Sequence, residues 1–129
     1  MTGSRGGCAV KYLLMIYMND QTWTGLSEQE RSALMAGHEE LQRVTRESGE
    51  LVDTNALGSP ETSAVVRVRD GEPVVTDGPF LEAKEYLAGY YLMDCESRER
   101  ALELAALIPD SRLCATEVWP VMFSAGVDV

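Results

Sequence analysis

A chain of 129 residues is of a size that favours one domain, and its composition, 45% hydrophobic and 25% charged, is that of a folded globular protein. Its 21 Asp and Glu against 11 Lys and Arg give a formal net charge of −10 at pH 7. That excess repels nucleic-acid phosphates and anionic membrane surfaces, so we expect neither as a partner.

Three widely spaced cysteines and a single histidine leave too few ligands for a His/Cys zinc site, and no C-x-x-C pair occurs. We therefore predict no metal, reduced thiols and a cytoplasmic location. No apolar run approaches the roughly 18 residues that cross a membrane. Residues 1–9 lack the apolar core of a signal peptide, and we predict a disordered leader there, a domain over residues 10–123 and a frayed tail at 124–129.

The first predicted strand, 10–18, is apolar on both faces, as a strand covered on both sides should be. A polar loop, 19–25, leads to a helix whose start is marked by Ser27 and Glu30 at the spacing of a capping box. Gly49 is the expected left-handed stop of this helix. Its predicted apolar stripe consists of Leu34, Leu41 and Thr45, with Met35 beside them.

The Asp-Gly pair at 70–71 predicts a β-hairpin, whose second arm the nearby Pro73 should shorten. Residues 77–80 are typical of a tight turn, and Ser97 should cap a second helix that ends before Pro109. The predicted buried face of that helix consists of Ala101, Leu104, Ala105 and Ile108. The other predicted strands are 51–57, 86–95 and 113–121, and the hairpin arms are 63–69 and 73–76.

The predicted order, β-α-β-hairpin-β-α-β, is that of a ferredoxin-like α+β domain, a split βαβ sandwich with an extra β-hairpin. Two helices can cover only one face of a four-stranded sheet, yet the strands at 10–18 and 86–95 are apolar on both faces. A second copy, sheet against sheet, would cover the other face, so we expect a homodimer. The alternative is a monomer whose extra hairpin and tail fold under the sheet.

His38 is the first candidate for chemistry, because it lies in the apolar stripe between Leu34 and Leu41. A histidine changes protonation near neutral pH, which suits general acid or base catalysis. The alternative is a structural role, since a histidine on the buried side of a helix commonly has its hydrogen bonds satisfied within the core.

Asp77 is the second candidate, and it opens the Asp-Gly-Pro-Phe turn. The turn could direct the Asp77 carboxylate toward His38, where it would orient the imidazole ring and raise its basicity. The alternative is a rigid turn without chemistry, in which Phe80 anchors the core.

Three more residues are candidate contacts for a substrate. Lys84 could supply positive charge to an anionic small molecule, although a solvated ion pair is the alternative. Tyr90 and Phe80 could form part of a pocket wall, although packing in a core or interface is the usual role of such residues. No nucleophile elbow, Walker loop, dinucleotide-binding, zinc-protease or EF-hand motif occurs, so we predict no cofactor.

Residues 75–80 read Val-Thr-Asp-Gly-Pro-Phe, and the matching residues that follow are Glu82, Lys84, Glu85, Leu87, Gly89, Tyr90 and Tyr91. This stretch resembles the signature of the DGPF-type members of the YCII-related family, and the similarity extends over residues 10–123. The resemblance implies a dimeric α/β-barrel relative of the ferredoxin-like fold. It also implies a His–Asp pair in a cleft, here His38 and Asp77.

Two functions remain open at this point. One is a small-molecule enzyme in which His38 is the acid or base, Asp77 orients it and Lys84 helps to bind an anionic substrate. The other is a non-catalytic small-molecule-binding or regulatory module, because the resemblance also implies a link to extracytoplasmic-function sigma factor systems. A cofactor-free oxygenase is a third hypothesis, which rests only on analogy with other dimeric α/β-barrel proteins.

Overall fold

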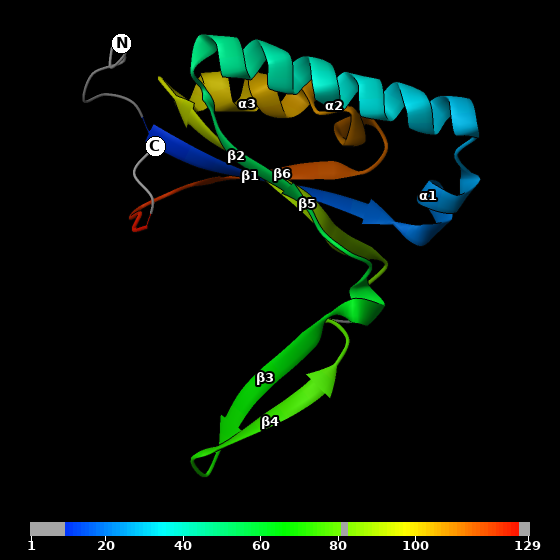
Figure 1. Ribbon diagram of the computed structural model, residues 1–129, viewed down its shortest axis with the longest axis vertical. Coiled ribbons are helices and arrows are strands. Elements are labelled where there is room, and N and C mark those ends of the chain that lie inside the picture. Colours follow the sequence, from blue (N-terminus) through cyan, green and yellow to red (C-terminus); the bar gives the residue numbers. More distant parts are fainter. Residues whose placement is uncertain (1–9, 81–82, 127–129) are drawn as a thin grey trace.

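Figure 1 shows the computed structural model, which describes residues 10–80 and 83–126. The expected leader, 1–9, lies outside the described residues, as do Glu82 of the DGPF-type stretch and the last three residues of the expected tail. The described part of the chain forms a four-stranded sheet with helices on one side and a separate hairpin on the other.

The main sheet consists of β1 (Val10–Asn19), β2 (Leu51–Ala56), β5 (Glu85–Cys95) and β6 (Ala115–Pro120). Its order is β2-β5-β1-β6, and each neighbouring pair is antiparallel. The long strands β1 and β5 occupy the centre, which agrees with their predominantly apolar sequences. This arrangement confirms the predicted α+β class and is consistent with a ferredoxin-like fold.

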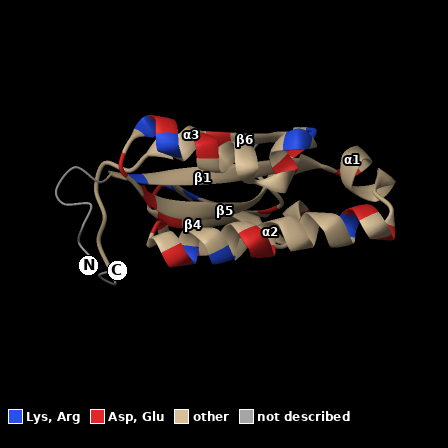
Figure 2. Ribbon diagram, turned by 90° about the horizontal axis from the view of Figure 1, so that it is seen from above, with Lys and Arg blue, Asp and Glu red and all other residues tan. Residues whose placement is uncertain are grey.

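Two long helices, α2 (Glu28–Ser48) and α3 (Arg98–Leu107), lie side by side over one face of the sheet (Figures 1 and 2). The predicted capping box is present, because the Ser27 hydroxyl accepts from the Glu30 amide and the Glu30 carboxylate accepts from the Ser27 amide. Gly49 ends α2 with a φ of 83°, as expected for a left-handed stop. Within the described residues, no helix is both long enough and apolar enough to cross a membrane.

The residues after β1 form a short helix, α1 (Asp20–Gly25), where a polar loop was expected. The side chain of Asn19 accepts a hydrogen bond of 2.8 Å from the Thr22 amide and so caps this helix. Two 3-10 turns, η2 (Pro60–Thr62) and η3 (Pro109–Arg112), also lie outside the predicted elements. Because η3 and the residues after it continue to 114, the last strand starts at Ala115 rather than at 113.

The predicted hairpin is present as β3 (Ala64–Arg69) and β4 (Glu72–Asp77). Asp70 and Gly71 both have positive φ, 52° and 79°, as a tight two-residue hairpin turn requires. The expectation of a short second arm was wrong, since Pro73 pairs with Val68 and both arms have six residues. Proline is tolerated there because the hairpin has only edge strands, which do not need every N–H for pairing.

The core lies between the sheet and the two long helices. Alternate residues of β1 and β5 point to this side, and the face of α3 predicted to be buried closes it. Leu34, Leu41 and Thr45 of α2 are buried as predicted, whereas Met35 is 57% exposed. The fully buried part of the core includes Leu14, Met93, Cys95, Leu104 and Ile108.

Candidate functional site

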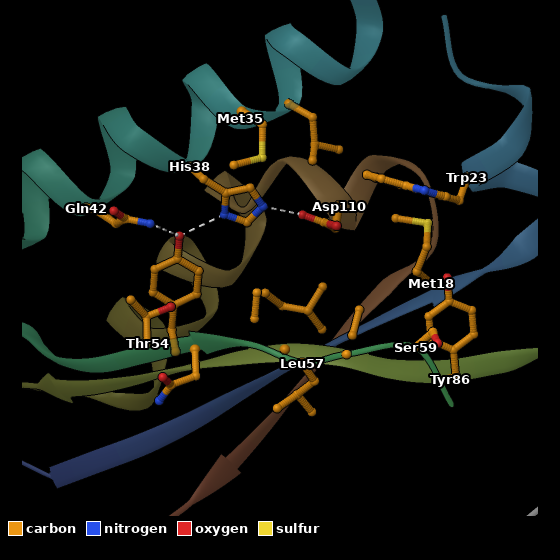
Figure 3. Close-up of a pocket in the computed structure, with 18 residues that line it drawn as sticks. Met18, Trp23, Met35, His38, Gln42, Thr54, Leu57, Ser59, Tyr86 and Asp110 are labelled. Atoms are coloured by element: carbon orange, nitrogen blue, oxygen red, sulfur yellow. Dashed lines mark hydrogen bonds and ion pairs between the residues drawn. The ribbon is translucent and has the colours of Figure 1, made fainter. Parts of the chain in front are cut away.

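A cavity of about 560 Å³ lies between α2 and the sheet, and α1 borders one end of it. Figure 3 shows His38 pointing from α2 toward the sheet, with Gln42 and Thr54 on one side and Trp23, Met18 and Tyr86 on the other. The volume of the cavity is within the range of about 300–1,000 Å³ that small-molecule sites occupy.

His38 is held at both ring nitrogens. Its Nε2 lies 2.5 Å from Oδ1 of Asp110, and its Nδ1 lies 2.7 Å from the hydroxyl of Tyr91. Asp110 is only 6% exposed and Tyr91 only 1%, so water competes little for either contact. The carboxylate can only accept, so the proton of a neutral His38 belongs on Nε2 and Nδ1 accepts from Tyr91.

Gln42 completes a chain of four hydrogen-bonded side chains. It follows His38 by one turn of α2, so both side chains reach the same tyrosine. The Gln42 amide nitrogen lies 3.3 Å from the Tyr91 hydroxyl and donates to it. The donors therefore run in one direction, from Gln42 to Tyr91, from Tyr91 to His38 and from His38 to Asp110 (Figure 3).

Asp110 reaches this chain because η3 approaches α2 closely. Gly37 immediately precedes His38, and a Cβ on Gly37 would lie only 2.6 Å from Cγ of Pro109. The absence of a side chain at Gly37 thus lets the Pro109 ring pack on the helix backbone. The Asp110 carbonyl accepts from the amides of Leu113 and Cys114, which fixes the turn that presents its carboxylate.

The ionisation of the Tyr91 phenol is affected by its place in this hydrogen-bond chain. Burial raises the pKa of Tyr91, and the nearby charge of Asp110 raises it further, while the hydrogen bond from Gln42 partly opposes the change. The phenol therefore keeps its proton at neutral pH and can donate it to His38.

The structure places Asp77 and Phe80 away from this cavity. Asp77 is the last residue of β4, where it pairs with Ala64, and it is exposed rather than part of a tight turn. The turn begins one residue later, at Gly78, whose φ is 95°. Phe80 is 66% exposed, and Arg67 stacks on its ring at 5.1 Å, so it is no core anchor. Within one chain the carboxylate that contacts His38 is that of Asp110, and the role expected of Asp77 stays a prediction.

Lys84 and Tyr90 also lie outside the cavity that contains His38. Lys84 is exposed and borders a second groove, near the root of the hairpin. Tyr90 lies on the opposite face of the sheet, because it precedes the buried Tyr91 in β5, and its hydroxyl accepts from Asn55 at 2.8 Å. His38 is thus the one predicted site residue that lines the cavity.

Sequence reasoning missed Asp110 and did not single out Tyr91 or Gln42. A signal existed for Gln42, which is four residues after His38 and therefore on the same helix face. The only sequence signal for Asp110 was the Pro-Asp pair that follows the second helix, and this pair is 72 residues away from His38. Among the described residues, no cluster of three or more His, Cys, Asp or Glu is arranged to hold a metal ion.

The fold and the site together define a small α+β domain with a buried carboxylate–histidine–tyrosine chain in a ligand-sized cavity. The chain matches the YCII-related domain over residues 10–123, and it therefore belongs to this family. A relative in Rhizobium meliloti (strain 1021), described as an uncharacterized protein, is 35% identical over 94 residues, which span 73% of this chain and 76% of the relative. The resemblance seen in the sequence is confirmed.

Proposed function

We propose that the protein is a small-molecule enzyme that transfers a proton to or from a ligand bound beside His38. The observation that carries this proposal is the one-directional chain of hydrogen bonds that ends on the buried carboxylate of Asp110. A carboxylate that holds one ring nitrogen leaves the other as the basic atom, which is the arrangement of known acid/base histidines.

The proton path follows from the contacts. Nδ1 of His38 is the basic atom, and in the structure it accepts a hydrogen bond from the Tyr91 hydroxyl. A proton removed from a ligand passes to the Tyr91 oxygen while the proton of Tyr91 passes to Nδ1. The resulting imidazolium is stabilised by Asp110, and the reverse sequence returns the proton to the product. The carboxylate partner in this proposal is Asp110 in place of the expected Asp77.

Nitrobenzisoxazole can test this proposal, because this neutral, planar compound opens its ring when one carbon-bound proton is removed. We expect the wild type to accelerate ring opening, and His38→Gln to lower the rate by about 100-fold or more. Asp110→Asn and Tyr91→Phe should also lose most of the rate, whereas Tyr90→Phe, on the other sheet face, should keep it. Equal rates for the wild type and His38→Gln would contradict the proposal.

A non-catalytic binding module is the second candidate function. The observation that favours it is that both nitrogens of His38 already have protein partners, so a ligand need not meet a free base. In that case a cognate ligand would raise the melting temperature without being converted. His38→Gln would also bind the ligand without converting it.

We also propose that the protein is a homodimer, of the dimeric α/β-barrel type, through the face of the sheet opposite the helices. Residues of the central strands that point away from the core are only partly covered within one chain, and Trp119 of β6 is 54% exposed. The pairing of the strands places these apolar residues on this face: Leu13, Met15, Leu92 and Trp119.

The hairpin lies on the same side of the sheet (Figure 1), and it carries a second apolar surface. One of its faces carries the Val66–Val75 and Val68–Pro73 pairs, and the three valines are 62–68% exposed. The other face carries the Arg67–Val74 and Arg69–Glu72 pairs. A hairpin of two strands is at best marginally stable alone in water, so its apolar face favours a partner.

The sizes of the two surfaces fit this proposal. Four strands about 4.8 Å apart and six to eleven residues long give roughly 500 Å² of flat sheet. A stable interface needs about 800 Å² per partner. The sheet reaches this area only when the surface of its protruding side chains and the apolar face of the hairpin are added to the flat area. A second copy presents the same two apolar surfaces, which suits a two-fold interface.

Sedimentation of the purified protein tests the homodimer. We expect a dimer at micromolar concentration, and a monomer for Leu92→Glu, which would bury a charge at the centre of the interface. Leu102→Glu introduces the same charge on the exposed side of α3 and should leave the dimer intact. A wild type that sediments as a monomer would be inconsistent with this interface.

A further inference from the structure

The ionisable groups around the cavity limit the charge of its ligand. The lining has one carboxylate, that of Asp110, and of the described residues that line it none is Lys or Arg. Arg31 is on the same helix as His38, but it stacks on the Trp23 ring at 5.0 Å and donates to the Trp23 carbonyl, and it is not part of the lining. An anion in the cavity would therefore meet the carboxylate of Asp110 without a Lys or Arg in the described lining to offset it.

The groove at Lys84, where an anion was expected to bind, does not favour a negatively charged ligand either. Lys84 borders the second groove, and four of the described residues that line this groove are acidic. Their effect is visible at Tyr86, whose pKa is raised by burial and then by the charges of Asp20 and Glu61. These four described residues are Asp20, Glu61, Glu85 and Glu117.

Polar side chains lie at both ends of the cavity, but the lining between them is mainly apolar (Figure 3). His38, Gln42 and Thr54 lie on the side shown at the left of Figure 3, and the opposite side is formed by Trp23, Met18, Tyr86 and Ser59. Thr54 already donates to the Tyr90 carbonyl at 2.9 Å, and Gln42 donates to Tyr91. At the His38 end the ligand thus needs a single polar group, and most of the remaining lining that its body would meet is apolar.

From these observations we infer that the ligand is a neutral, largely apolar small molecule with one hydrogen-bonding group that meets the His38–Tyr91 pair. The inference rests on the proposed role of this cavity as the ligand site and adds the ligand class. A neutral ligand avoids the cost of desolvating an anion beside the buried carboxylate of Asp110. Its body would pack against apolar side chains, chiefly Met18, Trp23, Leu34, Met35 and Leu57.

Two fluorescent probes with nearly the same skeleton test the ligand class. N-phenylnaphthylamine is neutral, and anilinonaphthalene sulfonate carries one negative charge on a similar pair of aromatic groups. We expect the neutral probe to bind one molecule per chain and at least about tenfold more tightly than the sulfonate. A sulfonate that binds as tightly as the neutral probe would overturn the inference.

A charge introduced at the cavity shows whether the probes bind there. Met35 lines the cavity and is 57% exposed on α2, so Met35→Lys should fold. Both probes lose the same packing contact with Met35, but only the sulfonate gains a cation, so the ratio of sulfonate to neutral-probe affinity should rise by about fivefold to tenfold. Leu102→Lys adds the same charge on α3, outside the cavity lining, and should alter neither affinity. If Met35→Lys and Leu102→Lys behave alike, the probes bind elsewhere and the inference fails.

His38→Gln separates this inference from the proposed function. We expect it to abolish proton transfer while the neutral probe still binds within about threefold of the wild-type affinity, because the apolar body of the probe makes most of the contacts. Proton transfer by a protein that prefers the sulfonate would contradict the ligand class alone. A protein that prefers the neutral probe but transfers no proton would contradict the proposed enzyme alone.

Discussion

Tyr91 and His38 join the sheet to α2 through a hydrogen bond of 2.7 Å, with their ring planes only 6° apart. The two rings are thus nearly parallel, and the phenolic O–H meets the imidazole at Nδ1. The ring of His38 therefore cannot rotate without breaking the contact with Tyr91 or the one with Asp110. Its tautomer is the property of the site that can be measured most directly.

We predict that neutral His38 carries its proton on Nε2. Asp110 accepts at that nitrogen, and a carboxylate cannot donate. Because His38 is the only histidine of the chain, one imidazole appears in a proton–nitrogen correlation spectrum and needs no assignment. Asp110→Asn should shift the population toward the Nδ1–H form, with Tyr91 then accepting. A wild type that already has its proton on Nδ1 would contradict the direction of the hydrogen-bond chain.

We predict that stability falls with rising pH above the ordinary range of tyrosine ionisation, and that Tyr91 contributes to the fall. The raised pKa of Tyr91 means that the folded protein keeps a proton that the unfolded chain loses above about pH 10. The contribution of Tyr91 is complete below that pH and is lost as the pH rises through its folded pKa. Urea unfolding at increasing pH measures this loss.

Tyr91→Phe should flatten this pH dependence. Tyr17→Phe removes another phenol with a raised pKa, but in a more exposed setting beside Glu117, and should flatten it less. The two variants are compared by the slope of unfolding free energy against pH. Equal slopes for Tyr91→Phe and the wild type would show that burial does not hold the proton of Tyr91.

Local sequence signals predicted most of the fold because they act over a few residues. Ser27 with Glu30, Gly49, and Asp70 with Gly71 each have one favoured conformation, and each was found where it was predicted. The helix and strand positions followed from the periodicity of apolar residues in the same way. The short helix α1 and the turn η3 were missed, because few residues and no apolar period define them.

The site was harder to predict because its contacts depend on tertiary structure. His38 could be chosen from residue type and helix position alone. Asp110 reaches His38 only because η3, which follows α3, packs against α2, and nothing near Asp110 in the sequence indicates that contact. The DGPF-type turn favoured Asp77 as the carboxylate partner of His38. That residue lies on the hairpin, which projects away from the cavity (Figure 1).

The buried ion pair between Glu50 and Arg100 should contribute to the stability of the helical layer. Arg100 contacts both Glu50 carboxylate oxygens, at 2.7 and 3.0 Å, and Glu50 is 5% exposed. We predict that Arg100→Met costs roughly 2 kcal/mol, less than the about 3–5 kcal/mol of a fully buried pair. The reason is that Arg100 is partly exposed and the Ser48 hydroxyl still donates to Glu50 after the change.

Arg43 provides a matched control for that measurement. It also bridges two glutamates, Glu40 and Glu47, but all three side chains are more than half exposed. Arg43→Met should therefore destabilise the protein much less than Arg100→Met does, measured by urea unfolding in the same buffer. Similar costs for the two arginine variants would argue against a special role for the buried pair.

The contact between Gly37 and Pro109 should control how Asp110 meets His38. Alanine in place of glycine within a helix normally stabilises by about 0.5–1 kcal/mol. Here the new methyl group would lie 2.6 Å from Cγ of Pro109, and overpacking of this kind costs about 1–3 kcal/mol. We predict that Gly37→Ala is destabilising by about 1 kcal/mol net and changes the imidazole signals of His38, because η3 must move away from α2.

Pro109→Ala should restore both properties in the Gly37→Ala background, since it removes the ring atom that the methyl group meets. The double-mutant cycle separates this coupling from the independent effect of losing a proline. Gly25→Ala in α1 has no atom within 4 Å of its new methyl group and should show only the ordinary effect of alanine in a helix. If Gly37→Ala stabilises the protein as much as Gly25→Ala does, the Pro109 contact does not position Asp110.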